Sequence, residues 1–212
     1  DTALEGTMIA KMRNAGQACT AANRIYVQAG IYETFIDKLQ TRMAAMKVGP
    51  GTAPETECGP MISAKARDKL ERLVENAISA GAKLRCGGAK PNRPGFYYPP
   101  TVLVDVPMDA ELNREEIFGP VAALSKFESE EEVIAKANDT EYGLAAYIFT
   151  RDTARGFRVA RQVESGMIAL NRGLVSDPAA PFGGVKQSGL GREGGTHGIY
   201  EFLESKYIAT SI

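Results

Sequence analysis

The sequence is poor in histidine and cysteine, and it has no excess of charge of either sign. Its 212 residues include one histidine, so a histidine-rich metal site is excluded and no metal site is predicted. The three cysteines form no Cys-x-x-Cys pair, which argues against a disulfide framework and favours a reducing compartment. The balance of 25 Lys+Arg against 26 Asp+Glu gives no support for nucleic-acid binding.

Long apolar runs are also absent. No segment approaches the roughly 18 residues that a membrane span needs. Glu5, Lys11 and Arg13 interrupt the region where a signal peptide would lie. We therefore expect no membrane partner and a cytoplasmic location. Because the first residue is Asp1 rather than Met, we also expect a processed chain or a piece of a longer protein.

Helical and strand patterns alternate along the chain, and the alternation predicts an α/β fold with a mostly parallel open sheet and helices on both faces. Helix starts are expected at the capping boxes of Thr2 with Glu5 and Ser129 with Glu132, and at Asp152. Apolar periodicity predicts helices over residues 4–12, 35–46, 70–78 and 157–163. Strands are predicted over residues 24–27, 83–86, 101–104, 121–127, 145–149 and 167–170.

Cys19 lies in the connection between a predicted helix end at residues 14–16 and a predicted strand at residues 24–27. A thiol in a tight connection can be exposed, with backbone N–H groups directed at a reacting oxygen, and this suits a nucleophile. The alternative is a small buried hydrophobic residue, as most free cysteines are. Cys58, in a turn-like segment, and Cys86, at a strand end, are interpreted as structural.

The glycine-rich segment 181–194 contains two patterns that resemble phosphate-binding loops. Residues 189–194 fit G-x-G-x-x-G, but loop residues precede them where the dinucleotide fingerprint needs a strand. Residues 184–189 have P-loop spacing, but Leu190 stands where the lysine is required. We therefore interpret the segment as a loop with unusual backbone freedom, or alternatively as a connection that packs closely.

Three separated blocks resemble the signature segments of the aldehyde dehydrogenase superfamily in order and spacing. They are Gly16-Gln-Ala-Cys19, Glu116-Ile-Phe-Gly-Pro120, and the Pro-Phe-Gly-Gly-Val-Lys-Gln-Ser-Gly-Leu-Gly-Arg-Glu segment at 181–193. Residues 138–146 and 202–206 add to the match, so the resemblance covers essentially the whole chain. Within the superfamily the sequence is most similar to the succinate-semialdehyde dehydrogenases.

The resemblance implies an oxidoreductase that uses NAD or NADP to convert an aldehyde to an acid, and the choice of cofactor stays open. Cys19 would attack the aldehyde carbon and supply one backbone N–H to the oxyanion. Hydride would then pass to the nicotinamide, and water would cleave the thioester. Glu116 would hold a ribose hydroxyl of the cofactor, Phe118 would lie against its nicotinamide half, and Phe182 would form a wall of the aldehyde pocket.

Substrate choice, in this resemblance, depends on Arg13 and Ser176. Relatives that act on apolar aldehydes commonly have an aromatic residue six positions before the nucleophile, where this sequence has Arg13. Ser176 matches the serine that joins that arginine on a distal carboxylate, so succinate semialdehyde or a similar ω-carboxylated aldehyde is the expected substrate. The alternative for Arg13 is a helix-end side chain that interacts with the helix dipole. Ala21 stands where some relatives have a redox-active second cysteine, so no such disulfide is expected.

The family's cofactor-binding domain, its general-base glutamate and its oligomerisation hairpin have no counterpart in these residues. The isolated chain is therefore expected to be inactive. Residues 1–205 would form the catalytic domain, and residues 206–212 a tail strand that pairs with a neighbouring subunit of a homo-oligomer. Two alternatives remain: a non-catalytic binding or assembly module that keeps the fold, and a thiol acyl-transfer enzyme without a nicotinamide.

Overall fold

The computed structural model describes residues 1–212 and contains a central four-stranded sheet. Its strands are β1 (Ile25–Gln28), β2 (Lys83–Cys86), β3 (Thr101–Val104) and β4 (Val121–Phe127). The strand order is β1-β4-β3-β2, in which β1, β4 and β3 are parallel and β2 is an antiparallel edge strand. The predicted α/β fold with a mostly parallel sheet is therefore confirmed.

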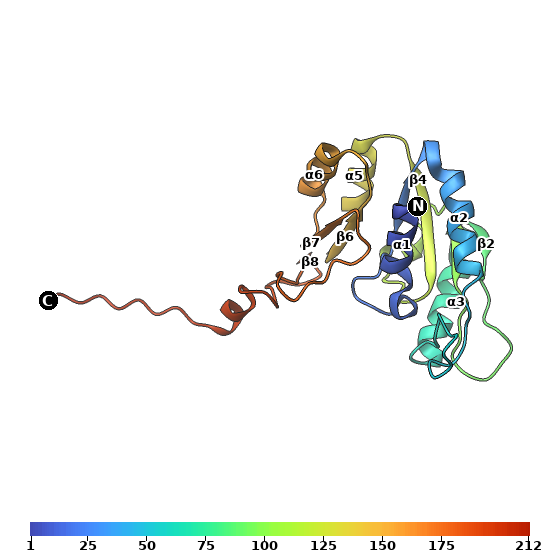
Figure 1. Cartoon of the computed structure of the whole chain (residues 1–212), viewed down its shortest axis with the longest axis horizontal. Coiled ribbons are helices and arrows are strands. Elements are labelled where there is room, and N and C mark those ends of the chain that lie inside the picture. Colours follow the sequence, from blue (N-terminus) through green and yellow to red (C-terminus); the bar gives the residue numbers. More distant parts are fainter.

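Four helices flank this sheet: α1 (Thr2–Met12), α2 (Tyr32–Ala44), α3 (Ala64–Ser79) and the short α4 (Glu111–Arg114). Alternate residues of β4 belong to two separate hydrophobic cores, because successive side chains of a strand point to opposite faces. Ala122 and Leu124 pack in the core that α1 and α2 complete, whereas Val121 and Ala123 pack with α3 and α4. The expected helices on both faces are confirmed (Figure 1).

The remaining elements form a smaller layer beside the central sheet (Figure 1). It consists of α5 (Glu130–Asn138), β6 (Ala145–Ile148), α6 (Thr153–Gln162) and β7 (Met167–Leu170). Strands β6 and β7 pair in parallel, and β5 (Tyr142–Gly143) pairs antiparallel with β8 (Val185–Lys186). Three single-turn 3-10 helices complete the chain: η1 (Arg13–Gly16), η2 (Ala29–Ile31) and η3 (Gly198–Phe202).

Two of the three predicted helix starts are confirmed in their side-chain contacts. The Ser129 hydroxyl accepts the backbone N–H of Glu132, and Asp152 caps α6 through the N–H of Arg155. The capping box of Thr2 with Glu5 is wrong, because α1 begins one residue earlier and Asp1 is its N-cap residue, without a side-chain cap. The Glu5 carboxylate instead pairs with Arg42 of α2 at 2.6 Å.

Arg24 connects the central sheet to α5. Its guanidinium donates hydrogen bonds to the carbonyl oxygens of Lys136 and Ala137, both at 2.9 Å, and of Asp139 at 3.2 Å. Carbonyl groups in the last turn of a helix have no partner within the helix, so a guanidinium is well suited to satisfy them.

The C-terminal residues extend away from the body of the molecule (Figure 1). Residues 203–212 are exposed and contain no strand, because no other segment of the chain pairs with them. The tail strand expected at residues 206–212 is therefore not formed within the single chain, and its pairing with a neighbouring subunit stays a prediction. None of the helices is long and apolar enough to cross a membrane.

Candidate active site

The loop that carries Cys19 begins where α1 ends. Asn14, Ala15 and Gly16 all adopt left-handed backbone conformations, with φ values of 53°, 54° and 73°. A Cβ atom on Gly16 would lie 2.2 Å from the carbonyl oxygen of Gly119, so only glycine fits at this position. This close approach places the Cys19 loop directly against the segment that follows Glu116.

Cys19 lies in a tight turn at the surface. The backbone N–H of Ala21 donates to the carbonyl oxygen of Ala18 at 2.9 Å, and the thiol of Cys19 is exposed. Cys58 is completely buried, and burial raises the pKa of its thiol to about 11; burial also raises the pKa of the half-buried Cys86. Because the thiolate is the reactive form of cysteine, Cys19 is the thiol best placed to react.

The side chain of Gln17 connects this loop to residues 60–62. Its side-chain oxygen accepts the backbone N–H of Ile62 at 2.9 Å, and its side-chain nitrogen donates to the carbonyl oxygen of Pro60 at 3.2 Å. The turn that carries Cys19 is thus anchored to a segment 43 to 45 residues away in the sequence. A fixed turn keeps the thiol in one position relative to the rest of the site.

Arg13, exposed at the end of α1, reaches back over the same turn. Its Nη2 atom donates to the hydroxyl oxygen of Thr20 at 3.1 Å. The Tyr147 hydroxyl on β6 donates to the backbone oxygen of Thr20 at 2.8 Å. Together with Ile9, Ala10, Ala18, Ala21 and Gly173, these residues line a small hollow that includes both sequence neighbours of Cys19.

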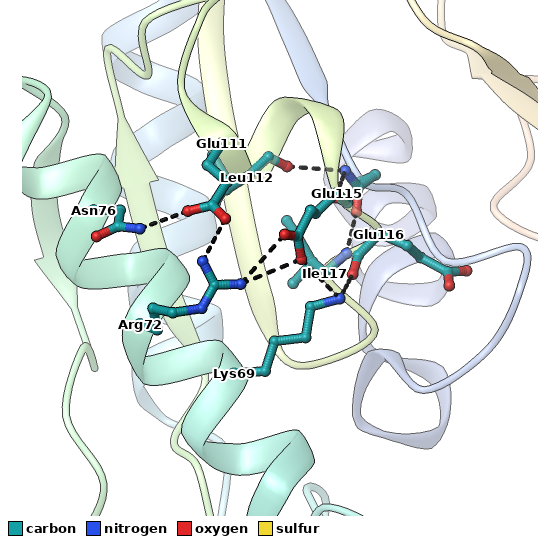
Figure 2. A network of polar contacts seen from close by, with 9 residues as sticks. Lys69, Arg72, Asn76, Glu111, Leu112, Glu115, Glu116 and Ile117 are labelled. Carbon is teal, nitrogen blue, oxygen red and sulfur yellow. Dashed lines mark hydrogen bonds and ion pairs between the residues drawn. The ribbon is translucent and has the colours of Figure 1, made fainter.

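Glu116 and Phe118 lie on an irregular segment that a polar network holds in place (Figure 2). Arg72 of α3 contacts the carboxylates of Glu111 and Glu115, and the Lys69 ammonium donates to the backbone oxygen of Glu116 at 2.7 Å. Figure 2 shows the carboxylate of Glu116 pointing away from α3, and no hydrogen bond or ion pair engages it. The network therefore fixes the backbone and leaves this carboxylate free to bind a ligand.

Asn23 attaches this segment to the Cys19 side of the site. Its side-chain nitrogen donates to the carbonyl oxygens of Leu112 and Glu115, and its side-chain oxygen accepts the N–H of Ile117 at 2.7 Å. Ile117 is buried, whereas Phe118 is 38% exposed and has a φ of 51°. An aromatic ring held at the surface by a left-handed backbone is a candidate contact surface for a ligand.

Lys11 is a charged residue of the site interior that the sequence analysis missed. Its side chain is 1% exposed and forms no hydrogen bond or ion pair. Burial lowers the pKa of its ammonium to about 7, although the nearby carboxylate of Glu116 favours the charged form. Lys11 therefore lies close enough to the Glu116 carboxylate for the two groups to interact electrostatically.

Ser176 and Phe182 lie on the loops that follow β7. Ser176 is half-buried, and its hydroxyl forms no hydrogen bond with Arg13. Phe182 is half-buried and is joined to Glu193 by two backbone hydrogen bonds of 2.7 and 2.8 Å. The structure thus brings Arg13 together with the Cys19 loop, and that loop against the Glu116 segment; no hydrogen bond links Ser176 or Phe182 to them. No group of three or more His, Cys, Asp or Glu residues is arranged to hold a metal ion.

The comparisons with known proteins are consistent with this arrangement. The model of the aldehyde dehydrogenase family matches residues 1–208. The chain belongs to that family. A succinate-semialdehyde dehydrogenase from Paenarthrobacter nicotinovorans is 52% identical over 98% of this chain and 46% of its own length. A glutarate-semialdehyde dehydrogenase from Pseudomonas aeruginosa is 50% identical over 98% of this chain and 43% of its own length.

Solved aldehyde dehydrogenase structures have the same fold as this chain. A crystal structure described as an NADP-dependent enzyme from Escherichia coli superposes with a TM-score of 0.96 and 48% identity. The match covers 98% of this chain and 43% of the Escherichia coli chain. This aldehyde dehydrogenase chain therefore spans less than half the length of the curated relatives that it matches.

Thr20, Tyr147, Asn23 and Lys11 were not found by sequence reasoning. Thr20 and Tyr147 are 127 residues apart, so no local pattern connects them. A polar residue immediately before a predicted strand was the only signal available for Asn23. A lysine on the apolar side of a helical pattern was the corresponding signal for Lys11.

Proposed function

We propose that the chain is the catalytic domain of an aldehyde dehydrogenase that uses NAD or NADP. Its substrate would be succinate semialdehyde or a similar ω-carboxylated aldehyde. The observation that supports this most directly is the exposed thiol of Cys19, with the guanidinium of Arg13 held over the same turn by Thr20. The semialdehyde dehydrogenases among the relatives support the same substrate class.

In the proposed reaction, the Cys19 thiolate attacks the aldehyde carbon and forms a carbon–sulfur bond. The negative charge that develops on the aldehyde oxygen is stabilised by backbone N–H donors, of which Cys19 contributes one. Loss of hydride from the carbon attached to Cys19 leaves a thioester, and bound NAD(P)+ would supply the acceptor for that hydride. Water then cleaves the Cys19 thioester, and the thiol is regenerated as the acid leaves.

The residues near Glu116 fit a cofactor of this kind. The Glu116 carboxylate forms no hydrogen bond, although Lys11 lies near it, and a carboxylate accepts hydrogen bonds from hydroxyl groups such as those of a ribose. Phe118 offers an exposed ring one residue beyond the buried Ile117. We therefore assign Glu116 to a ribose hydroxyl and Phe118 to the nicotinamide half of the cofactor.

Arg13 and Ser176 are assigned to the distal carboxylate of the substrate, and Phe182 to a wall of the aldehyde pocket. A guanidinium has five N–H donors in a fixed planar arrangement, which matches a carboxylate and discriminates against uncharged aldehydes. Only one hydrogen bond of Arg13, to Thr20, is formed within the chain, so its other donors remain available.

The test uses the full-length polypeptide that the gene encodes, with NAD(P)H formation as the measurement. Cys19→Ala should abolish oxidation of succinate semialdehyde, and surviving activity would exclude Cys19 as the nucleophile. Arg13→Ala should raise KM for succinate semialdehyde by about 10- to 100-fold, as expected for losing a hydrogen bond to a charged group. KM for butanal, an uncharged aldehyde of equal length, should stay within about twofold, since its contacts do not involve Arg13. Equal effects on both aldehydes would refute the carboxylate role.

The C-terminal tail supports a proposal about assembly. Tyr207 and Ile208 are 89% and 76% exposed, although both are apolar residues of a type that favours strands. We assign residues 1–205 to the catalytic domain and residues 206–212 to a strand that pairs with another copy of the chain in a cytoplasmic homo-oligomer. Deletion of residues 206–212 should reduce the molecular mass measured by light scattering; an unchanged mass would contradict this role.

A further inference from the structure

The guanidinium of Arg13 depends on a single partner. Arg13 is exposed at the end of α1, where a long side chain has many accessible rotamers. It forms no ion pair, and its only hydrogen bond within the chain is the one from Nη2 to Thr20 Oγ1. Thr20 is therefore the residue that decides where this guanidinium lies relative to the neighbouring thiol.

Thr20 is itself held firmly. It is 4% exposed, and its backbone oxygen accepts a hydrogen bond of 2.8 Å from the hydroxyl of Tyr147, a residue of β6. Burial raises the pKa of the Tyr147 hydroxyl, so this group stays protonated and continues to donate. The β-branched side chain of threonine has few χ1 rotamers, which restricts the position of its hydroxyl further.

Two hydrogen bonds thus connect the β6–β7 layer to the guanidinium through one buried residue. Tyr147 is anchored in β6, whose pairing with β7 is continuous from Ala145 to Ile148. Gly173, three residues beyond the end of β7, lines the same hollow as Arg13 and Tyr147. A carboxylate that bound the remaining donors of Arg13 would meet a guanidinium whose direction is already set by Thr20.

We propose that Thr20 and Tyr147 are positioning residues for substrate specificity: Tyr147 holds Thr20, and Thr20 holds Arg13 in the orientation that binds the distal carboxylate of an aldehyde. This inference rests on the proposed function. The inference adds that the preference for ω-carboxylated aldehydes depends on the Thr20 hydroxyl, which acts on the substrate only through Arg13. Preorganisation of this kind removes the ordering cost that a mobile arginine would have on binding.

The test compares Thr20→Val, Thr20→Ser and Tyr147→Phe in the full-length polypeptide, with kcat and KM for succinate semialdehyde and butanal. Valine keeps the shape of threonine without the acceptor, so KM for succinate semialdehyde should rise about tenfold while kcat and the butanal constants stay within about twofold. Serine restores the acceptor and should restore KM. Tyr147→Phe should shift KM in the same direction by a smaller factor.

Thr7→Val is the matched control, because Thr7 is also a buried threonine, and its hydroxyl forms no hydrogen bond. It should leave both KM values unchanged. An unchanged KM for succinate semialdehyde in Thr20→Val, or an equal rise for both aldehydes, would overturn the proposal. A wild-type protein that does not prefer succinate semialdehyde over butanal would instead refute the proposed function, so the two failures are distinguishable.

If Thr20→Val lacks activity, protection of Cys19 from alkylation tests the positioning role instead. Succinate should slow alkylation of Cys19 by iodoacetamide in the wild type, whereas uncharged succinamide should not. The succinate concentration that gives half protection should rise about tenfold in Thr20→Val and return to the wild-type value in Thr20→Ser. Equal protection in wild type and Thr20→Val would overturn the positioning role.

Discussion

Replacement of Lys11 by methionine should stabilise the folded protein. Lys11 is a buried ammonium without a hydrogen-bond partner, and methionine has an unbranched side chain of similar length without the charge. The expected result contrasts with most substitutions of buried residues, which lower the free energy of unfolding. It follows from the cost of keeping a charge away from water when no partner compensates for it.

The size of the effect follows from the pKa of Lys11. Its ordinary value of 10.5 applies to the unfolded chain, and burial lowers the pKa in the folded state to about 7. Between these two pH values the unfolded state binds more protons, so the wild-type protein gains stability as pH rises. At about 1.4 kcal/mol per tenfold change in proton affinity, the penalty is about 4 kcal/mol at pH 7 and about 2 kcal/mol at pH 9.

Denaturation in urea at pH 7 and pH 9 measures this difference directly. The free energy of unfolding of Lys11→Met should exceed that of the wild type at pH 7, and the excess should shrink by about 2 kcal/mol at pH 9. The exposed Lys47 provides the control, since Lys47→Met should change stability by less than about 0.5 kcal/mol. A Lys11→Met variant that is less stable than wild type, or whose excess does not depend on pH, would refute the reasoning.

Other variants test the loops and helix ends that build the site. Asn23→Ala removes three hydrogen bonds and should lower the free energy of unfolding by about 2–4 kcal/mol in urea titrations; a loss below about 0.5 kcal/mol would contradict the anchoring role. Arg24→Ala leaves the Ala137 carbonyl without its side-chain partner and the Lys136 carbonyl with the Tyr26 hydroxyl alone. It should cost about 2 kcal/mol, with amide exchange of α5 accelerated; unchanged exchange would contradict the connection. A thiol titration of the native protein should show Cys19 reacting much faster than Cys58, with all three thiols equivalent only after denaturation; equal native rates would contradict the burial of Cys58.

The sequence predicted most strands of four or more residues well because they are short apolar runs between turns. Residues 83–86, 101–104, 121–127 and 167–170 all became strands with these boundaries. It missed β5 and β8, since a strand of two residues has no periodicity to detect. It misplaced the start of α1 because a capping box is a pattern of side-chain types, whereas the contact of Glu5 with Arg42 depends on how α1 and α2 pack.

Candidate site residues could be proposed from the sequence where residue type alone suggests the chemistry, and their roles stay predictions. A thiol, an arginine and a carboxylate in family-like blocks indicated Cys19, Arg13 and Glu116. The residues that orient these groups could not be found in the same way. The hydrogen bonds of Asn23 span 89 to 94 residues, and such partners are brought together only by the parallel pairing of β1 with β4.

The Cys19 loop and the Glu116 segment are positioned by backbone contact rather than by paired side chains. Gly16 meets Gly119 so closely that any side chain at residue 16 must push the two segments apart. A change at this contact should therefore alter the distance between the thiol and the carboxylate assigned to the cofactor. Thr20 lies outside it and is connected to Tyr147 instead, so its substitution alters the orientation of Arg13 and leaves the relation of Cys19 to Glu116 intact. The position of the thiol and the orientation of Arg13 are thus fixed by different contacts.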